Sequence, residues 1–130
     1  MVVRVVRVVK VIDASALAAM VFGEPVASIA ARLIGDADLI APKLLSYEMA
    51  NIAVTKARRH PELRDILLSA LRRFLAFPIE YRDVDFAAVA ELANAKGLSG
   101  YDAAYLWLAL DTGAPHVTLD RQLAAAAKYP

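Results

Sequence analysis

Four carboxylate side chains stand beside apolar stretches of this sequence, where a charged residue is unfavourable unless it has a structural or chemical role. They are Asp13, Glu48, Asp102 and Asp120. Like charges held close together raise one another's pKa, so such a group stays ionised only where positive charge is supplied. Oxygen ligands without His or Cys favour hard ions. If the fold brings the four acids together, they predict a site for Mg²⁺ or Mn²⁺.

Each acid taken alone also has a structural interpretation. Asp13 or Ser15 could cap a helix that begins there, and Thr118 or Asp120 could cap the last helix. For these positions the cap is the stronger interpretation until the acids are considered as a set.

The same choice stays open for the other two acids. Ser99-x-x-Asp102 matches a capping box. Glu48 could be a solvated residue in the first turn after Ser46, where the helix dipole favours an anion.

Short β-branched apolar runs predict four strands, at 8–12, 39–41, 78–81 and 116–119. Apolarity without alternation is typical of strands covered on both faces of a parallel sheet. Helices are predicted between them, among others over about 62–75 and from Asp85 to about Lys96, closed by Gly97. This alternation indicates an α/β fold with a mostly parallel sheet. Asp13 and Asp120 would then stand at carboxyl ends of strands, where such sheets bind ligands.

The composition of the 130 residues indicates one domain over 1–130, with 1–7 as a possible N-terminal extension. Although 59% of residues are hydrophobic, no apolar run reaches the ~18 residues of a membrane span, and no signal peptide is visible. We therefore expect a cytoplasmic protein. The absence of Cys excludes disulfides, thiolate metal sites and a Cys nucleophile. The net charge of +1 means that any affinity for nucleic acid must come from a local patch.

The sequence resembles the PIN-domain ribonucleases, most closely the VapC-type toxins of VapBC toxin–antitoxin pairs. Four segments carry the resemblance in the order of the family, and together they cover about 8–127. They are Val11-Ile12-Asp13-Ala14-Ser15, Glu48-x-x-Asn51, Leu98-Ser99-Gly100-Tyr101-Asp102-Ala103-Ala104-Tyr105 and Val117-Thr118-Leu119-Asp120-Arg121.

The resemblance implies a three-layer α/β/α domain in which Asp13, Glu48, Asp102 and Asp120 are catalytic and bind Mg²⁺ or Mn²⁺. Further residues would support these ligands, namely Ser15, Asn51 and Thr118. It also implies an RNA substrate, a homodimer and a small VapB-like antitoxin. Family members usually add a fifth strand after the last helix, which this sequence does not show, so a sheet of four to five strands is expected.

The predicted reaction is metal-assisted hydrolysis of RNA phosphodiester bonds, leaving a 5′-phosphate and a 3′-hydroxyl. A bound Mg²⁺ would lower the pKa of its water and neutralise charge on the phosphate. Asp13 and Asp102 are the expected inner ligands, with Asp120 and Glu48 completing the site.

Substrate contacts are less defined. The segment 56–73 is rich in Lys and Arg and could bind phosphates, although a solvated helix surface explains it better because no aromatic residues interleave. Tyr47, Tyr101 and Tyr105 are candidates for base stacking, although Tyr105 could instead belong to the core. Trp107 is expected in the core. The two histidines are expected at structural positions, His60 at a helix end and His116 at a strand start.

Other classes fit less well. A haloacid-dehalogenase-type phosphatase needs a second Asp where Ser15 stands, no Gly-rich phosphate loop is present, and the order of the acids does not suit a receiver domain. Two alternatives stay open: a catalytically silent PIN-like module that binds RNA or a partner, and an RNA-processing nuclease without an antitoxin.

Overall fold

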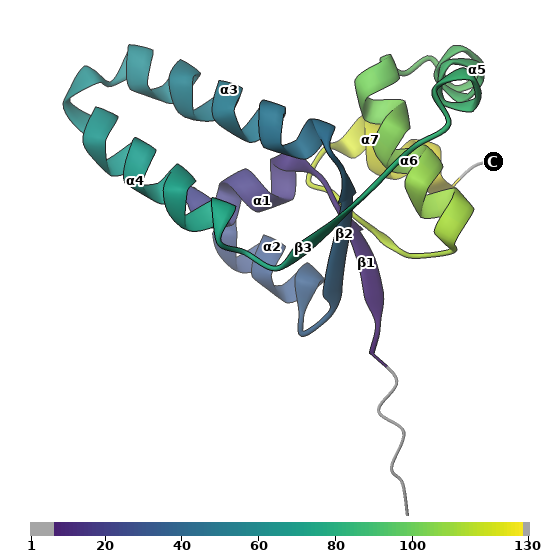
Figure 1. Cartoon of the computed structure of the whole chain (residues 1–130), viewed down its shortest axis with the longest axis horizontal. Coiled ribbons are helices and arrows are strands. Elements are labelled where there is room, and N and C mark those ends of the chain that lie inside the picture. Colours follow the sequence, from purple (N-terminus) through teal and green to yellow (C-terminus); the bar gives the residue numbers. More distant parts are fainter. Residues whose placement is uncertain (1–6, 129–130) are drawn as a thin grey trace, which may run out of the picture.

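The computed structural model describes residues 7–128 and shows a parallel four-stranded sheet in the order β3-β2-β1-β4 (Figure 1). The strands are β1 (Val9–Ile12), β2 (Asp38–Pro42), β3 (Ile79–Arg82) and β4 (His116–Val117). The helices are α1 (Ala14–Val21), α2 (Ala27–Ile34), α3 (Leu44–Arg59), α4 (Arg64–Leu75), α5 (Phe86–Lys96), α6 (Gly100–Thr112) and α7 (Arg121–Lys128), with a 3₁₀ turn, η1, at Pro61–Leu63. The predicted α/β class and parallel sheet are confirmed.

The topology explains why the sheet is covered on both faces. The chain moves in one direction through β1, β2 and β3, so right-handed crossovers put α1–α4 on one face. It then returns across the sheet from β3 to β4, which puts α5 and α6 on the other (Figure 1). The connections leaving β1 and β4 therefore diverge, and in such sheets a ligand crevice opens at that point.

The central strand β1 is buried as its sequence predicts. Val11 and Ile12 have no exposed surface, because β2 and β4 flank β1 and helices cover both faces. Val11 pairs with Ile40 on one side and with His116 on the other. This register determines which side chains of β1 and β4 meet near Asp13.

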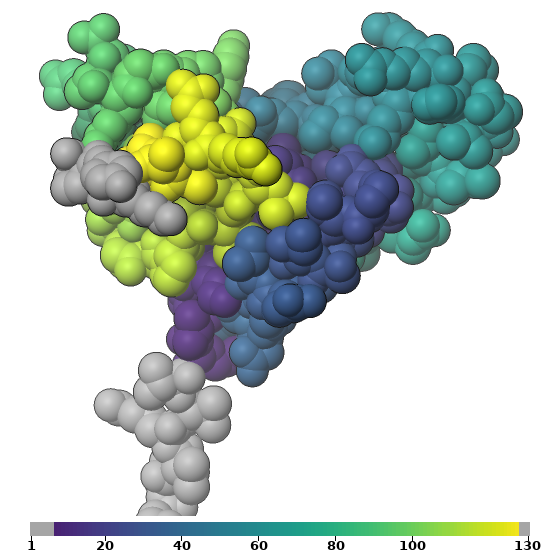
Figure 2. All heavy atoms as spheres, turned by 180° about the vertical axis from the view of Figure 1, so that it is seen from behind, coloured from purple at the N-terminus to yellow at the C-terminus, as the bar shows by residue number. Residues whose placement is uncertain are grey.

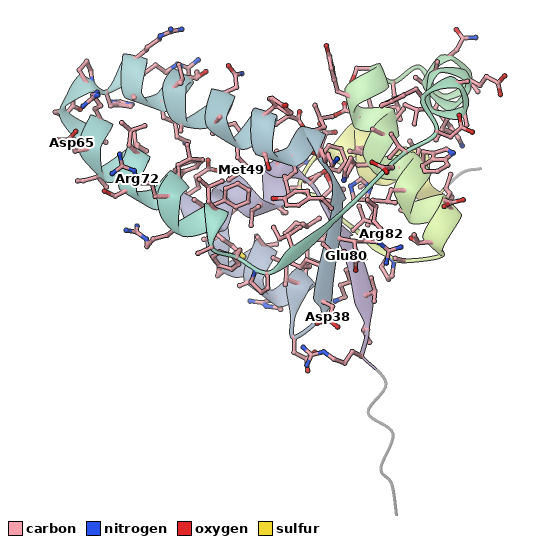
Figure 3. All side chains as sticks on the ribbon, viewed as in Figure 1. Asp38, Met49, Asp65, Arg72, Glu80 and Arg82 are labelled. Atoms are coloured by element: carbon pink, nitrogen blue, oxygen red, sulfur yellow. The ribbon has the colours of Figure 1, made fainter. Side chains whose placement is uncertain are left out.

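Helices α3 and α4 form an antiparallel arm that extends beyond the sheet (Figure 1). Asp65 lies at its far end, while Met49 lies toward the sheet (Figure 3). Viewed from behind, the teal arm stands apart from the green-to-yellow lobe of α5–α7 (Figure 2). The arm is held together by an apolar stripe on α4, comprising Leu67, Ala70 and Phe74.

Some boundaries differ from the prediction. Strand β4 ends at Val117 instead of residue 119, because the Leu119 amide donates to the Ser15 side chain. Trp107 is only partly buried, so its placement in the core was wrong in part.

Within residues 7–128 the sheet has four strands, and the predicted extension lies outside that range except for Arg7. No helix in this range is long and apolar enough to cross a membrane.

Candidate metal-binding site

Asp13 is a buried carboxylate at the junction of β1 and α1. It caps α1, since its Oδ1 accepts from the Ala16 amide at 3.2 Å and from the Ser15 hydroxyl at 2.6 Å. Its Oδ2 lies 3.3 Å from Nε2 of the buried His116. Burial alone would raise the pKa of Asp13, but His116, Ser15 and Thr118 stabilise the ionised form and lower the pKa overall. Asp13 therefore caps α1 and also keeps the ionised carboxylate that a metal ligand requires.

Ser15 connects Asp13 to the segment after β4. Its hydroxyl donates to Asp13 and accepts from the Leu119 amide at 2.9 Å. Thr118 Oγ1 lies 3.3 Å from Ser15 Oγ and accepts from the Asp120 amide at 3.1 Å. Ser15 and Thr118 thus lie beside the acids they were predicted to support.

Glu48 is half-buried on α3 and is held by Tyr105 of α6. The Tyr105 hydroxyl donates to Glu48 Oε1 at 2.5 Å. Burial raises the pKa of Glu48, the charges of Asp102 and Asp13 raise it further, and the Tyr105 bond opposes them. Tyr105 is almost completely buried, at 1% exposure, so of its two predicted roles the core position is confirmed and base stacking is wrong. Glu48 also lies in the second turn of α3, because the helix begins at Leu44, before Ser46.

Asp102 and Asp120 combine capping geometry with electrostatic coupling. Ser99 caps α6 by accepting from the Asp102 amide at 3.0 Å, and Asp120 Oδ1 accepts from the Leu123 amide at 3.0 Å. Burial raises the pKa of Asp102, and the charges of Asp120 and Asp13 add to this effect. The Asp102 carboxylate is therefore costly to ionise until a cation compensates it.

The fold links the four acids through pairwise electrostatic interactions, with Asp102 interacting with each of the other three. Asp13 acts on both Glu48 and Asp102, and Asp120 acts on Asp102. Within residues 7–128, however, no three acidic or histidine side chains stand close enough to form a ready-made ligand set. Oxygen ligands and repelling charges suit Mg²⁺, which also keeps several waters between itself and its ligands. Ligation by these four residues stays a prediction.

Sequence reasoning missed the contact that His116 makes. The residue was expected only as the start of a strand, which is correct for its backbone. Its side chain also touches Asp13 and stacks on Tyr105, with ring centroids 6.1 Å apart. The contact depends on the strand register, which the sequence alone does not reveal. This register pairs His116 with Val11, two residues before Asp13.

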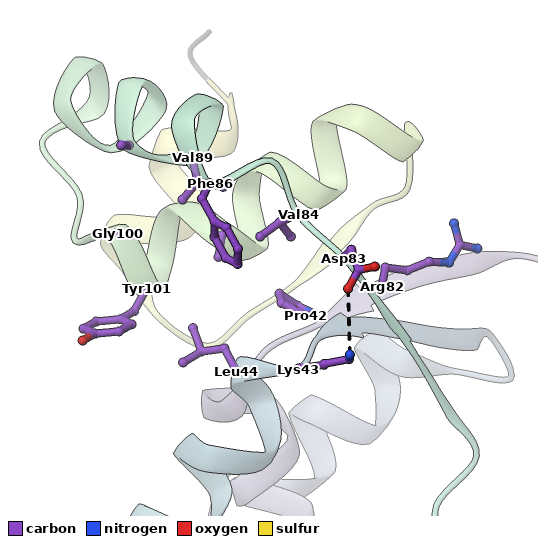
Figure 4. Close-up of a pocket in the computed structure, with 12 residues that line it drawn as sticks. Pro42, Lys43, Leu44, Arg82, Asp83, Val84, Phe86, Val89, Gly100 and Tyr101 are labelled. Atoms are coloured by element: carbon purple, nitrogen blue, oxygen red, sulfur yellow. Dashed lines mark ion pairs between the residues drawn. The ribbon is translucent and has the colours of Figure 1, made fainter.

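Two hollows share lining residues, and the first of them contains Glu48. One, of about 330 Å³, is lined by Glu48 together with Leu44, Tyr47, Asn51, Ile52 and Tyr101. The other, of about 410 Å³, is mainly apolar and shares Leu44 and Tyr101 with the first. Figure 4 shows Tyr101 on the side of the second hollow away from Asp83, with Phe86 between them. Asn51 thus shares a hollow with Glu48, while its predicted support of the acids stays a prediction.

Comparison with known protein families assigns this α/β fold and its acids to one family. The PIN domain family model matches residues 10–129, so the chain belongs to the PIN domain family. Among known proteins it resembles Ribonuclease VapC3 of Pyrobaculum aerophilum, with 38% identity over 126 residues, covering 92% of this chain and 94% of that protein. The crystal structure of PAE2754 from Pyrobaculum aerophilum superposes with a TM-score of 0.77 and 29% identity, covering 95% of this chain and 89% of that one. The predicted family is confirmed.

Proposed function

We propose that this protein is a metal-dependent ribonuclease and the toxin of a VapBC-type toxin–antitoxin pair. The observation that carries the proposal is geometric: in a chain of the PIN family, the buried carboxylate of Asp13 follows β1 and is linked through Ser15 to the segment that carries Asp120. The similarity to Ribonuclease VapC3 over nearly the whole chain supports RNA as the substrate.

The roles of the side chains follow from their surroundings. Asp13 stays ionised because Ser15, Thr118 and His116 stabilise its charge, so it is the anchor for Mg²⁺ or Mn²⁺. Asp102 is the second inner ligand, and Glu48 and Asp120 complete the set. When bound, the ion supplies an activated water near neutral pH and neutralises charge on the phosphate.

The remaining groups hold this machinery in place. Tyr105 holds one oxygen of Glu48, and Glu48 lines the hollow of about 330 Å³. Ser15 holds the loop that carries Asp120 against the start of α1. Water replaces the 3′ oxygen on phosphorus, so the products carry a 5′-phosphate and a 3′-hydroxyl.

Cleavage of structured and single-stranded RNAs tests the proposal. The wild-type protein should cut in Mg²⁺ or Mn²⁺ and not in EDTA, and Asp13→Asn and Asp102→Asn should both be inactive. Asp111→Asn is the matched control, because Asp111 is an exposed acid at the far end of the same helix as Asp102. Activity that survives both substitutions at the proposed site would refute the mechanism.

The partners belong to the same proposal. By its resemblance to VapC-type toxins, the protein forms a homodimer and is inhibited by a VapB-like antitoxin. Light scattering after size exclusion measures the first. Co-expression with the product of a short neighbouring reading frame tests the second, since the complex should suppress cleavage.

A further inference from the structure

Two exposed tyrosines stand next to two of the proposed ligands. Tyr47 precedes Glu48 and is 76% exposed; Tyr101 precedes Asp102 and is 67% exposed. Tyr101 and Tyr105 are four positions apart and so share one face of α6. Tyr105 is buried in the core, whereas Tyr101, in the first turn of the helix, is exposed.

The two tyrosines come from different helices and line the same hollow. Tyr47 belongs to α3 and Tyr101 to α6, and the hollow of about 330 Å³ that they share also contains Glu48. Its volume lies at the lower end of the range of small-ligand sites. Anything seated there contacts Glu48, which lines the hollow itself, and lies against the first turn of α6, which also carries Asp102.

The chemistry of the walls selects a flat, partly polar occupant. Tyrosine rings stack on the faces of unpaired bases with little regard to sequence. Asn51, exposed in the same hollow, has an amide that can donate to and accept from the edge of a base. Leu44 and Ile52 add apolar surface to the lining of the hollow.

We propose that Tyr47 and Tyr101 hold an unpaired base of the RNA in this hollow, next to the bond that is cut, and that Asn51 contacts the edge of the base. The inference deepens the proposed ribonuclease function and rests on it. The face of a base that is stacked and paired in a duplex is not available to these rings, so the site can be tested by comparing loops with stems.

The test measures binding of hairpin RNA with a randomised loop, with 2-aminopurine in either the loop or the stem. The protein is the full chain carrying Asp13→Asn, which prevents cleavage and preserves a side chain that can cap α1. We expect quenching only of the loop probe. Adding Tyr47→Ala or Tyr101→Ala should weaken binding about 5- to 150-fold, the usual effect of removing one stacking ring. Tyr→Phe at either position should retain binding, because stacking needs the ring and not the hydroxyl.

Phe77→Ala is the matched control. Phe77 is also an exposed aromatic residue, at 46%, but it follows α4 and does not line this hollow. Its removal should change neither binding nor quenching. The proposal is overturned if the parent protein binds loop and stem alike, if the Ala variants bind normally, or if Phe77→Ala causes an equal loss.

Three further outcomes distinguish base binding from contact between copies of the chain, and base binding from RNA cleavage. If the Tyr→Ala variants change the mass of the protein by light scattering and leave loop quenching intact, the hollow is an interface between copies and the inference is wrong. If loop binding depends on the tyrosines but the wild-type protein cuts no RNA, the base site stands and the nuclease function fails. If the Tyr→Ala substitutions, made in the wild-type protein, leave RNA cutting normal, the nuclease function stands and the base site is wrong.

Discussion

Replacing Tyr105 with Phe removes one hydroxyl from the boundary between the core and the acidic crevice. The ring would keep its place, since it is 1% exposed and stacks on His116. The lost interaction is the 2.5 Å hydrogen bond to Glu48. Such bonds to charged groups contribute about 1.5–3 kcal/mol. Because Glu48 is only half-buried and water can partly replace the donor, we expect a loss of about 1–2 kcal/mol, or a melting temperature lower by about 3–10 °C.

The loss should depend on pH in a defined direction. Burial and the neighbouring acids raise the pKa of Tyr105, so it remains a donor throughout the experiment. Glu48 accepts most strongly when ionised, and its pKa is also raised. The cost of Tyr105→Phe should therefore be largest near about pH 7 and shrink toward about pH 4, as Glu48 becomes protonated.

Urea unfolding of both proteins without metal at the two pH values measures this cost. Tyr81→Phe is the control, because the Tyr81 hydroxyl only accepts from Ser46 at 3.2 Å in an exposed position. It should cost less than about 0.5 kcal/mol at either pH. A Tyr105→Phe variant as stable as wild type near neutrality, or equally destabilised at both pH values, would refute the reasoning.

Further predictions concern the acids and their supports. The pKa values of Glu48 and Asp102 are raised by folding, so the stability they contribute is present in full below their ordinary range and is lost as pH rises through the raised values. Without metal, these two groups should make the protein more stable at about pH 4.5 than at about pH 7, measured by denaturant unfolding; a decrease assignable to them would contradict this. Bound Mg²⁺ requires ionised ligands, so the rise in melting temperature on adding Mg²⁺ should grow with pH and be absent in Asp102→Asn. Ser15→Ala should cost about 1–3 kcal/mol, since it leaves the Leu119 amide without its acceptor, whereas Ser28→Ala on the exposed side of α2 should cost almost nothing.

Local patterns predicted the elements well, because the signals for strands and caps are local. The apolar run before Asp13 became the buried strand β1, and Asp85 and Gly97 begin and end α5 as expected. The same local logic also placed Asp13 and Asp120 at the carboxyl edge of the sheet.

The contacts that tune the site were not predictable in this way. Tyr105 and Glu48 are 57 positions apart and meet only because α6 packs across the sheet from α3. His116 reaches Asp13 through the pairing of β4 with β1, which no short sequence window contains. Residues that looked structural thus became the neighbours of the acids, because long-range packing decides which side chains meet.

Calorimetric titration of Mn²⁺ into the wild-type protein and the Asp102→Asn variant tests most directly whether the acids act as one cation site. Saturable binding by the wild type that is lost or greatly weakened in Asp102→Asn, while Asp111→Asn binds normally, is the predicted result. A wild-type protein that binds no Mn²⁺, or an Asp102→Asn variant that binds it equally well, would contradict it.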